Sequence, residues 1–175
     1  MFAASMEGQP VVLGFNLSGT QAKGVLPEPY FTTEFLNGRE GDAHGGEGYE
    51  ANIARLQKAA AGAGVFTAML DADGLVRSSP VFFRIGEGYY PSLSLATMAT
   101  FLHARAVKPV LDTLNDEMSR SQLDASDFDT IQLFTSKAGT VRFPVGYRMT
   151  STVQFRGSGG ASGGAFRYVS ASDVL

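Results

Sequence analysis

The residues best suited to chemistry are two aspartates that follow a short apolar run. Residues 65–70 are mainly apolar, and Asp71 and Asp73 follow them, with Gly74 completing an Asp-x-Asp-Gly motif. At the end of a strand this motif can supply a nucleophile and a general acid and base for phosphoryl transfer, with Mg²⁺ neutralising the phosphate. The first interpretation to weigh is therefore a metal-dependent phosphohydrolase.

The other groups that this chemistry needs are only partly present. Residues 130–135, with Ser136 and Lys137, form an apolar run that ends in hydroxyl groups, as does the second motif of phosphohydrolases of the haloacid-dehalogenase type. The metal also needs an acidic pair at a later strand end, but Asp173 is the only carboxylate after Lys137. This phosphohydrolase is retained as the alternative of another class.

The aspartates also have a structural interpretation. Asx side chains at Asp71 and Asp73 can accept hydrogen bonds from nearby backbone N–H groups, and Gly74 can supply the positive φ of a tight turn. Arg77 is spaced to pair with one of the two carboxylates and to link the chain on both sides of the turn. We favour this structural role over a role in ligand contact or signal transmission.

Other kinds of site are poorly supported. A calcium loop would need oxygen ligands where the chain has Leu75, Val76 and Arg77. The chain has no cysteine and only two histidines, His44 and His103, which excludes disulfides, thiolate nucleophiles and a multi-histidine metal centre. Neither histidine has a nucleophile elbow to serve, and we expect His103 to be a partly exposed helix residue. We predict no cofactor and no catalytic residue.

The elements that must position these residues begin with a buried strand over residues 10–17, with no amphipathic element before it. Residues 18–48 are rich in Gly, Pro and Glu, which predicts a mobile loop with a helical turn near 30–36. An amphipathic helix is predicted over 49–61. Residues 65–70 and 75–85 are predicted to pair as a two-strand meander about the Asp-Gly turn.

The second half is predicted to be helical and then antiparallel. A buried helix is expected from Pro91 to about residue 119, with Pro91 near its first position and Pro109 splitting off a segment over 110–118. Strands follow at 130–135, 140–145, 151–155 and 165–169. Residues 157–164 form a glycine-rich connector. Aromatic side chains of the long loop are expected to staple it to the core: Tyr30, Phe31 and Phe35.

Composition places the chain among globular domains. Its 175 residues suit one domain, and 44% hydrophobic against 18% charged residues excludes a disordered tail. The net charge of −3 offers no basic excess for nucleic-acid binding. No stretch approaches the roughly 18 apolar residues of a membrane-spanning helix. Ser170 and Asp173 have the spacing that opens a helix, so we expect a fragment of a longer protein.

The segments 62–84 and 90–96 carry a family resemblance. They resemble the type-two CHASE domain, an extracytoplasmic sensor whose motifs are "G-F-x-N", "D-x-D-G-x-x-R-x-x-P" and "Y-P-S-L-A-L-x-A". Residues 11–14 and 166–175 resemble its flanking strand and closing segment, so the likeness runs from end to end. The matching positions are Gly64, Phe66, Asp71, Asp73, Gly74, Arg77, Pro80, Tyr90, Pro91, Ser92, Leu93, Leu95 and Ala96. Thr67 departs from the family's Asn, and Ser78 and Ser79 replace more basic residues.

The resemblance implies a partial sensor domain over 1–175, with 62–96 as its signature hairpin and helix entry. Its fold would be α/β (α+β): a mixed sheet with an antiparallel C-terminal portion and packed helices, incomplete at both ends. The implied parent is a membrane-anchored bacterial receptor, a homodimer whose extracytoplasmic part precedes an adenylate or guanylate cyclase or, alternatively, a histidine kinase. Its signal would be an unknown small molecule or protein. A further hypothesis is that the domain is used only for protein–protein contact.

Overall fold

A computed structural model describes residues 2–36, 43–110, 128–157 and 172. Its helices are α1 (Phe2–Met6), α2 (Ala54–Ala59) and α3 (Leu93–Phe101), with a 3₁₀ turn, η2, at Tyr147–Met149. Its strands are β1 (Val12–Ser18), β2 (Ala22–Lys23), β3 (Phe31–Thr32), β4 (His44–Gly46), β5 (Gly48–Glu50), β6 (Gly62–Val65), β7 (Ser78–Pro80), β8 (Phe82–Ile85), β9 (Gly88–Pro91), β10 (Ala104–Val110), β11 (Thr130–Thr135), β12 (Thr140–Pro144) and β13 (Thr150–Thr152). The predicted mixed α/β class is confirmed.

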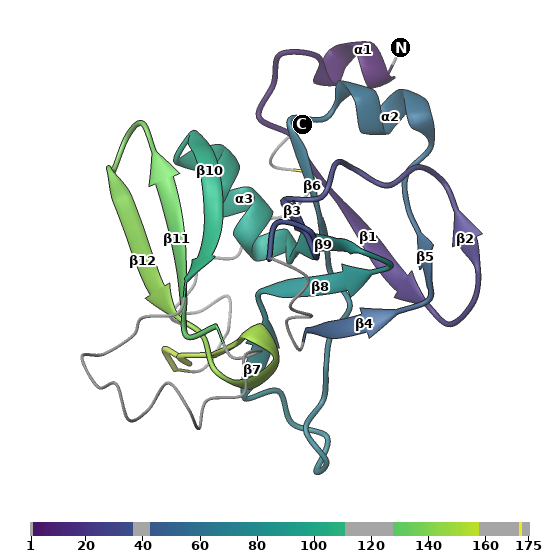
Figure 1. Ribbon diagram of the computed structural model, residues 1–175. Helices are drawn as coiled ribbons and strands as arrows, with labels where there is room; N and C mark the ends of the chain where they lie inside the picture. Colours follow the sequence, from purple (N-terminus) through teal and green to yellow (C-terminus); the bar gives the residue numbers. More distant parts are fainter. Residues whose placement is uncertain (1, 37–42, 111–127, 158–171, 173–175) are drawn as a thin grey trace.

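Two four-stranded sheets form one part of the fold (Figure 1). The first has the order β2-β5-β1-β6, in which β1 pairs with β6 in parallel and with β5 in antiparallel. The second has the order β3-β9-β8-β4, built on the tight β8–β9 hairpin whose turn uses Gly86 at φ 58°. The strand predicted over 10–17 is confirmed.

The β3-β9-β8-β4 sheet lies between two cores. Phe82 and Tyr89 pack into one core, whereas Phe83 and Tyr90 pack into the other. Successive side chains of a strand point to opposite faces, so adjacent aromatics serve both cores. This explains why β8 and β9 are nearly continuous runs of apolar and aromatic residues.

The antiparallel part comprises β10, β11 and β12, on the left in Figure 1. Ile131 and Leu133 alternate along β11 and are fully buried in the first core. The strands predicted at 130–135 and 140–145 are confirmed. The strand predicted at 151–155 is shorter and begins earlier, as β13.

Helix α3 packs among these sheets. It begins after Ser92, whose side chain accepts a hydrogen bond from the N–H of Leu95 at 3.2 Å and caps the helix. Leu95, Ala96 and Ala99 are its buried residues, and α3 contacts β1, β6, β9 and β10. Figure 1 shows the helix in the middle of the molecule between the β10–β12 sheet and β1.

The predicted meander about the Asp-Gly turn is wrong in its pairing. Strand β6 ends at Val65 and pairs with β1, while β7 pairs with β13, far along the chain. The local turn itself forms, with the N–H of Gly74 donating to the carbonyl of Asp71 at 2.8 Å. The turn was therefore predicted from sequence, but β6 and β7 each pair with a strand that is distant in the sequence.

The helix predicted from Pro91 to residue 119 is also wrong in length. Pro91 closes β9, and the chain from Ala104 to Val110 is strand β10. Pro109 lies in β10, which pairs only with β11 among the described residues, and an edge strand tolerates the missing N–H. The segment predicted over 110–118 lies outside the described residues, apart from Val110.

Three predictions for the first half need correction. A short helix, α1, precedes the first strand and buries Ala3 and Met6. The described part of 18–48 is not simply a mobile loop, because it contributes three short strands and a turn ending at Leu36. The helix predicted over 49–61 is shortened to α2 and has no buried residue, because Tyr49 and Glu50 belong to β5.

The last predicted elements fall outside the described residues, apart from Gly157 and Ser172. These elements are the 157–164 connector, the strand at 165–169 and the helix start at 170–173. Within the ranges that the structure covers, none of the helices has the length and hydropathy needed to cross a bilayer.

Candidate functional site

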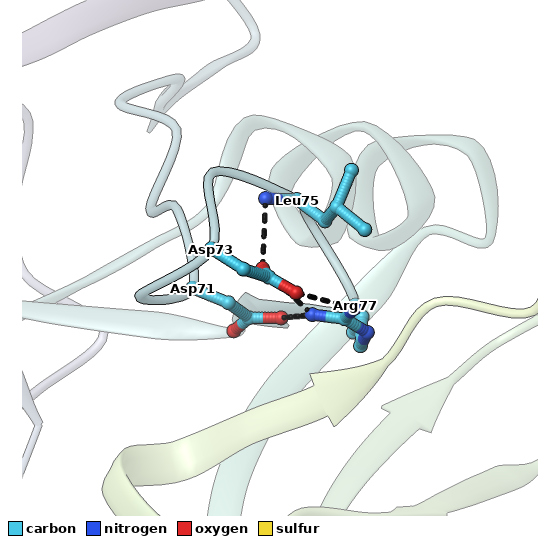
Figure 2. A network of polar contacts seen from close by, with 4 residues as sticks. All are labelled: Asp71, Asp73, Leu75 and Arg77. Carbon is cyan, nitrogen blue, oxygen red and sulfur yellow. Dashed lines mark hydrogen bonds and ion pairs between the residues drawn. The ribbon is translucent and has the colours of Figure 1, made fainter.

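The two aspartates of the motif both contact one arginine (Figure 2). Nη1 of Arg77 lies 3.1 Å from Oδ2 of Asp71 and 2.9 Å from Oδ1 of Asp73, and Nη2 lies 2.6 Å from Oδ2 of Asp73. The pair with Asp73 is therefore bidentate, the strongest geometry for a guanidinium and a carboxylate. Asp73 Oδ1 also accepts a hydrogen bond from the N–H of Leu75 at 3.2 Å.

These contacts favour the ionised form of Asp73. The hydrogen bond from Arg77 is the main cause, with a contribution from the backbone N–H of Leu75, and together they lower the pKa of Asp73 below 3.8. The same pairing raises the pKa of Arg77. A general acid and base needs a pKa near the working pH, and this arrangement moves Asp73 in the opposite direction.

The position of Asp71 also differs from that of a phosphohydrolase nucleophile. The apolar strand β6 ends at Val65, and residues 66–70 run as irregular backbone before Asp71. Its carboxylate is turned toward Arg77 rather than lying at a strand end. Among the residues that the structure describes, no group of three His, Asp or Glu side chains is placed to hold a metal ion. The geometry favours a clamped turn.

A second cluster of motif residues lies where β6 meets the start of α3. Gly64 is so close to Ser92 and Leu93 that a Cβ at this position would lie 2.7 Å from Leu93 Cα, Leu93 N and Ser92 O. Val65 and Ser92 also form a parallel β-bridge. Glycine at residue 64 lets the strand and the helix entry touch through their backbones.

The residues before this helix entry are buried. Tyr90 packs edge-to-face on Phe15, with ring centroids 6.0 Å apart, and burial is the main cause that raises its pKa. Pro91 is fully buried at the end of β9. Pro80 pairs with Thr150 and ties the end of the motif loop to β13. These motif residues therefore join the loop to β1, β9 and β13.

The motif loop and the start of α3 line an open surface cavity of about 460 Å³. Phe66, Ser92 and Leu93 line it, and Phe66 is 54% exposed. Thr67, which stands where the family has Asn, accepts a hydrogen bond from the N–H of Leu17 at 3.0 Å and lies 3.3 Å from Asn16 Oδ1. Thr67 thus forms a polar link from this loop to β1.

The remaining predicted residues lie elsewhere. His44 is in β4, paired with Phe83, and His103 follows α3. Phe31 is buried and stacks on Tyr89, with centroids 4.7 Å apart, so the predicted staple is confirmed for this ring. Phe35 is 53% exposed and contributes less.

Sequence reasoning missed the surroundings of His103. It was predicted to be a residue within a long helix, but α3 ends at Phe101 and His103 has a positive φ of 50° beside a second cavity. The signal was present in the sequence of residues 104–110, where Arg105 and Lys108 interrupt the small apolar residues and Pro109 suits an edge strand better than a helix.

The comparisons with known proteins give one match. A family model described as CHASE2 domain matches residues 1–175. No curated protein and no solved structure matches the chain.

Proposed function

Because this chain belongs to the CHASE2 family, we propose that it is the extracytoplasmic sensor of a membrane-anchored bacterial receptor. CHASE2 domains are extracellular sensory domains of signalling proteins and are not themselves catalytic. The observation that carries the proposal is the family match over the whole of residues 1–175. The output we propose is an adenylate or guanylate cyclase, with a histidine kinase as the second choice.

The mechanism we propose is a population shift in a dimeric receptor. A ligand that binds one conformation of the sensor more tightly moves the equilibrium toward that conformation, and its effect is limited to its differential affinity. The sensor must therefore have elements that move as a unit. The 62–96 segment suits this role, because Arg77 clamps its turn, β6 at its start pairs with β1, and Gly64 packs against the start of α3 at its end.

We propose that the motif residues act by shape. Asp71, Asp73 and Arg77 hold the loop, and Gly64 lets it pack against the helix entry. The acidic pair is engaged by a cation of the chain itself, which supports this role over attack on a phosphate.

The complete reading frame that contains the chain tests this function. We expect membrane-spanning segments and a cyclase or kinase domain in the same frame. A frame that has neither would overturn the proposed receptor.

A phosphatase assay separates the other class. With p-nitrophenyl phosphate and Mg²⁺ we expect no turnover, and Asp71→Asn should lower the unfolding midpoint. Turnover that disappears in a folded Asp71→Asn protein would instead support the phosphohydrolase. Glu34→Gln, which removes an exposed carboxylate outside the motif, is the control for loss of charge.

A further inference from the structure

A cavity of about 580 Å³ lies at the C-terminal end of α3, away from the motif loop. The end of the helix, the first half of β10 and the β11–β12 turn form its wall, and residues before β3 and β6 complete it. The lining residues are Tyr30, Ala61, Ala99, Thr100, His103, Ala104, Arg105, Ala106, Val107 and Ser136. This volume is within the range of about 300–1,000 Å³ typical of small-molecule sites.

The backbone at the rim of this cavity is in an unusual conformation. His103 has φ 50°, a left-handed conformation in which glycine is the usual residue after a helix. Its N–H donates to the carbonyl of Thr100 at 3.2 Å, and its own carbonyl accepts from the N–H of Ser136 at 3.3 Å. The β11–β12 turn thus holds the histidine in a conformation that a glycine would adopt without strain, and places an imidazole at the cavity.

A second backbone irregularity lies two residues further on. The register between β10 and β11 shifts between Ala104 and Ala106, so Arg105 is the extra residue of a β-bulge. Bulges re-aim a side chain that regular pairing would place elsewhere, and they are frequent beside binding sites. Here the bulge presents the exposed Arg105 to the same cavity as His103.

The lining has the chemistry of an anion site with an apolar floor. Among the described lining residues Arg105 is the one with a permanent charge, and none is acidic. Tyr30, Thr100 and Ser136 add hydroxyl groups, of which that of Ser136 already donates to the carbonyl of His103 at 3.5 Å. Burial raises the pKa of Tyr30 further, so its phenol remains a donor. The rest of the lining is small and apolar: Ala61, Ala99, Ala104, Ala106 and Val107.

We propose that this cavity binds a small organic carboxylate, with Arg105 as the partner of the carboxylate and His103 as a second polar contact. A planar guanidinium matches a carboxylate through two parallel hydrogen bonds. The alanines and Val107 receive the apolar body of the molecule. This inference rests on the proposed sensory function and deepens it, because it names the chemical class of the signal.

The test measures thermal unfolding of the 175-residue chain with benzoate, succinate and inorganic phosphate as probes. At a concentration about 100-fold above its Kd, a bound carboxylate should raise the midpoint by about 5 °C or more. Benzamide, which has the shape of benzoate without its charge, should give no shift. Arg105→Gln should abolish the shift, whereas Arg142→Gln, which removes the same charge from β12 of the same sheet, should leave it intact.

Several outcomes would overturn the proposal. One is that neither benzoate nor succinate raises the unfolding midpoint. The others are that benzamide raises the midpoint as much as benzoate does, or that the carboxylate raises the midpoint of Arg105→Gln as much as that of the unchanged protein. A shift with inorganic phosphate alone would replace the organic carboxylate by a free oxyanion. Failure of the sensory function is a different result: the chain would bind the carboxylate through Arg105, but the parent protein's reading frame would lack an output domain.

Discussion

Replacing Gly64 by alanine tests the contact between β6 and the helix entry. The new Cβ would lie 2.7 Å from Leu93 Cα, Leu93 N and Ser92 O, a separation that real Cβ atoms essentially never show. All three neighbours are backbone atoms, so no side-chain rotation relieves the overlap. The strand and the start of α3 must separate, although both are fixed by the Val65–Ser92 bridge and the Ser92 cap.

The magnitude follows from two opposing effects. Overpacking of this kind costs about 1–3 kcal/mol, and rigid backbone neighbours place it at the upper end, near about 3 kcal/mol. Alanine also restricts the unfolded chain, which returns about 0.4–1 kcal/mol. The net loss in the free energy of unfolding is therefore about 2 kcal/mol, which lowers the midpoint by about 4–8 °C for a chain of this size.

The assay is thermal and urea unfolding followed by circular dichroism, with Gly62→Ala as the matched control. Gly62 lies in the same strand, but the nearest atom to its Cβ would be Thr100 Oγ1 at 3.2 Å, which a side-chain rotation can move, so the change should stay within about 0.5 kcal/mol. Equal stabilities of Gly64→Ala and Gly62→Ala would refute the close-approach reasoning.

Three further predictions concern other parts of the molecule. Phe31→Ala should lower the free energy of unfolding by about 3–5 kcal/mol in urea denaturation, because the ring is buried against Tyr89. Phe35 is half-exposed, so Phe35→Ala should lower it by about 0.5 kcal/mol, and similar losses in the two variants would contradict the staple. In an NMR titration, Arg77→Gln should raise the pKa of Asp73 toward 3.8, and an unchanged pKa would contradict the pairing. In the unchanged protein, the stabilisation from this pair is complete above that unfolded-state value and is lost as the pH falls through the lower pKa of the folded state. His103→Gly should raise the free energy of unfolding by up to about 1 kcal/mol while weakening carboxylate-induced stabilisation; a less stable variant would show that the histidine itself supports the fold.

Some local features follow from residues that lie close together in the sequence. Gly74 adopts φ 81° in the predicted turn, and Arg77 pairs with both aspartates. The strand around residues 12–17 and the strands over 130–135 and 140–145 were likewise predicted, because apolar patterning acts over a few positions.

The predicted elements failed where a local pattern fits two structures. Residues 104–110 follow a helix and contain small apolar residues, so a continued helix was predicted. In the structure these residues instead form a strand that pairs with β11. The meander about Asp71 and Asp73 failed for the same reason, because β6 pairs with β1 and β7 with β13.

By itself the sequence determined the chemistry at short range: that Arg77 pairs with a carboxylate of the motif, where the chain turns at Gly74, and which family motif it carries. Tertiary structure alone decided that β6 lies against the start of α3 at Gly64, and that His103 and Arg105 share one cavity. The physical reason is that hydrogen bonds within a few residues depend on local conformation, whereas strand partners and cavities depend on contacts between segments far apart in the chain.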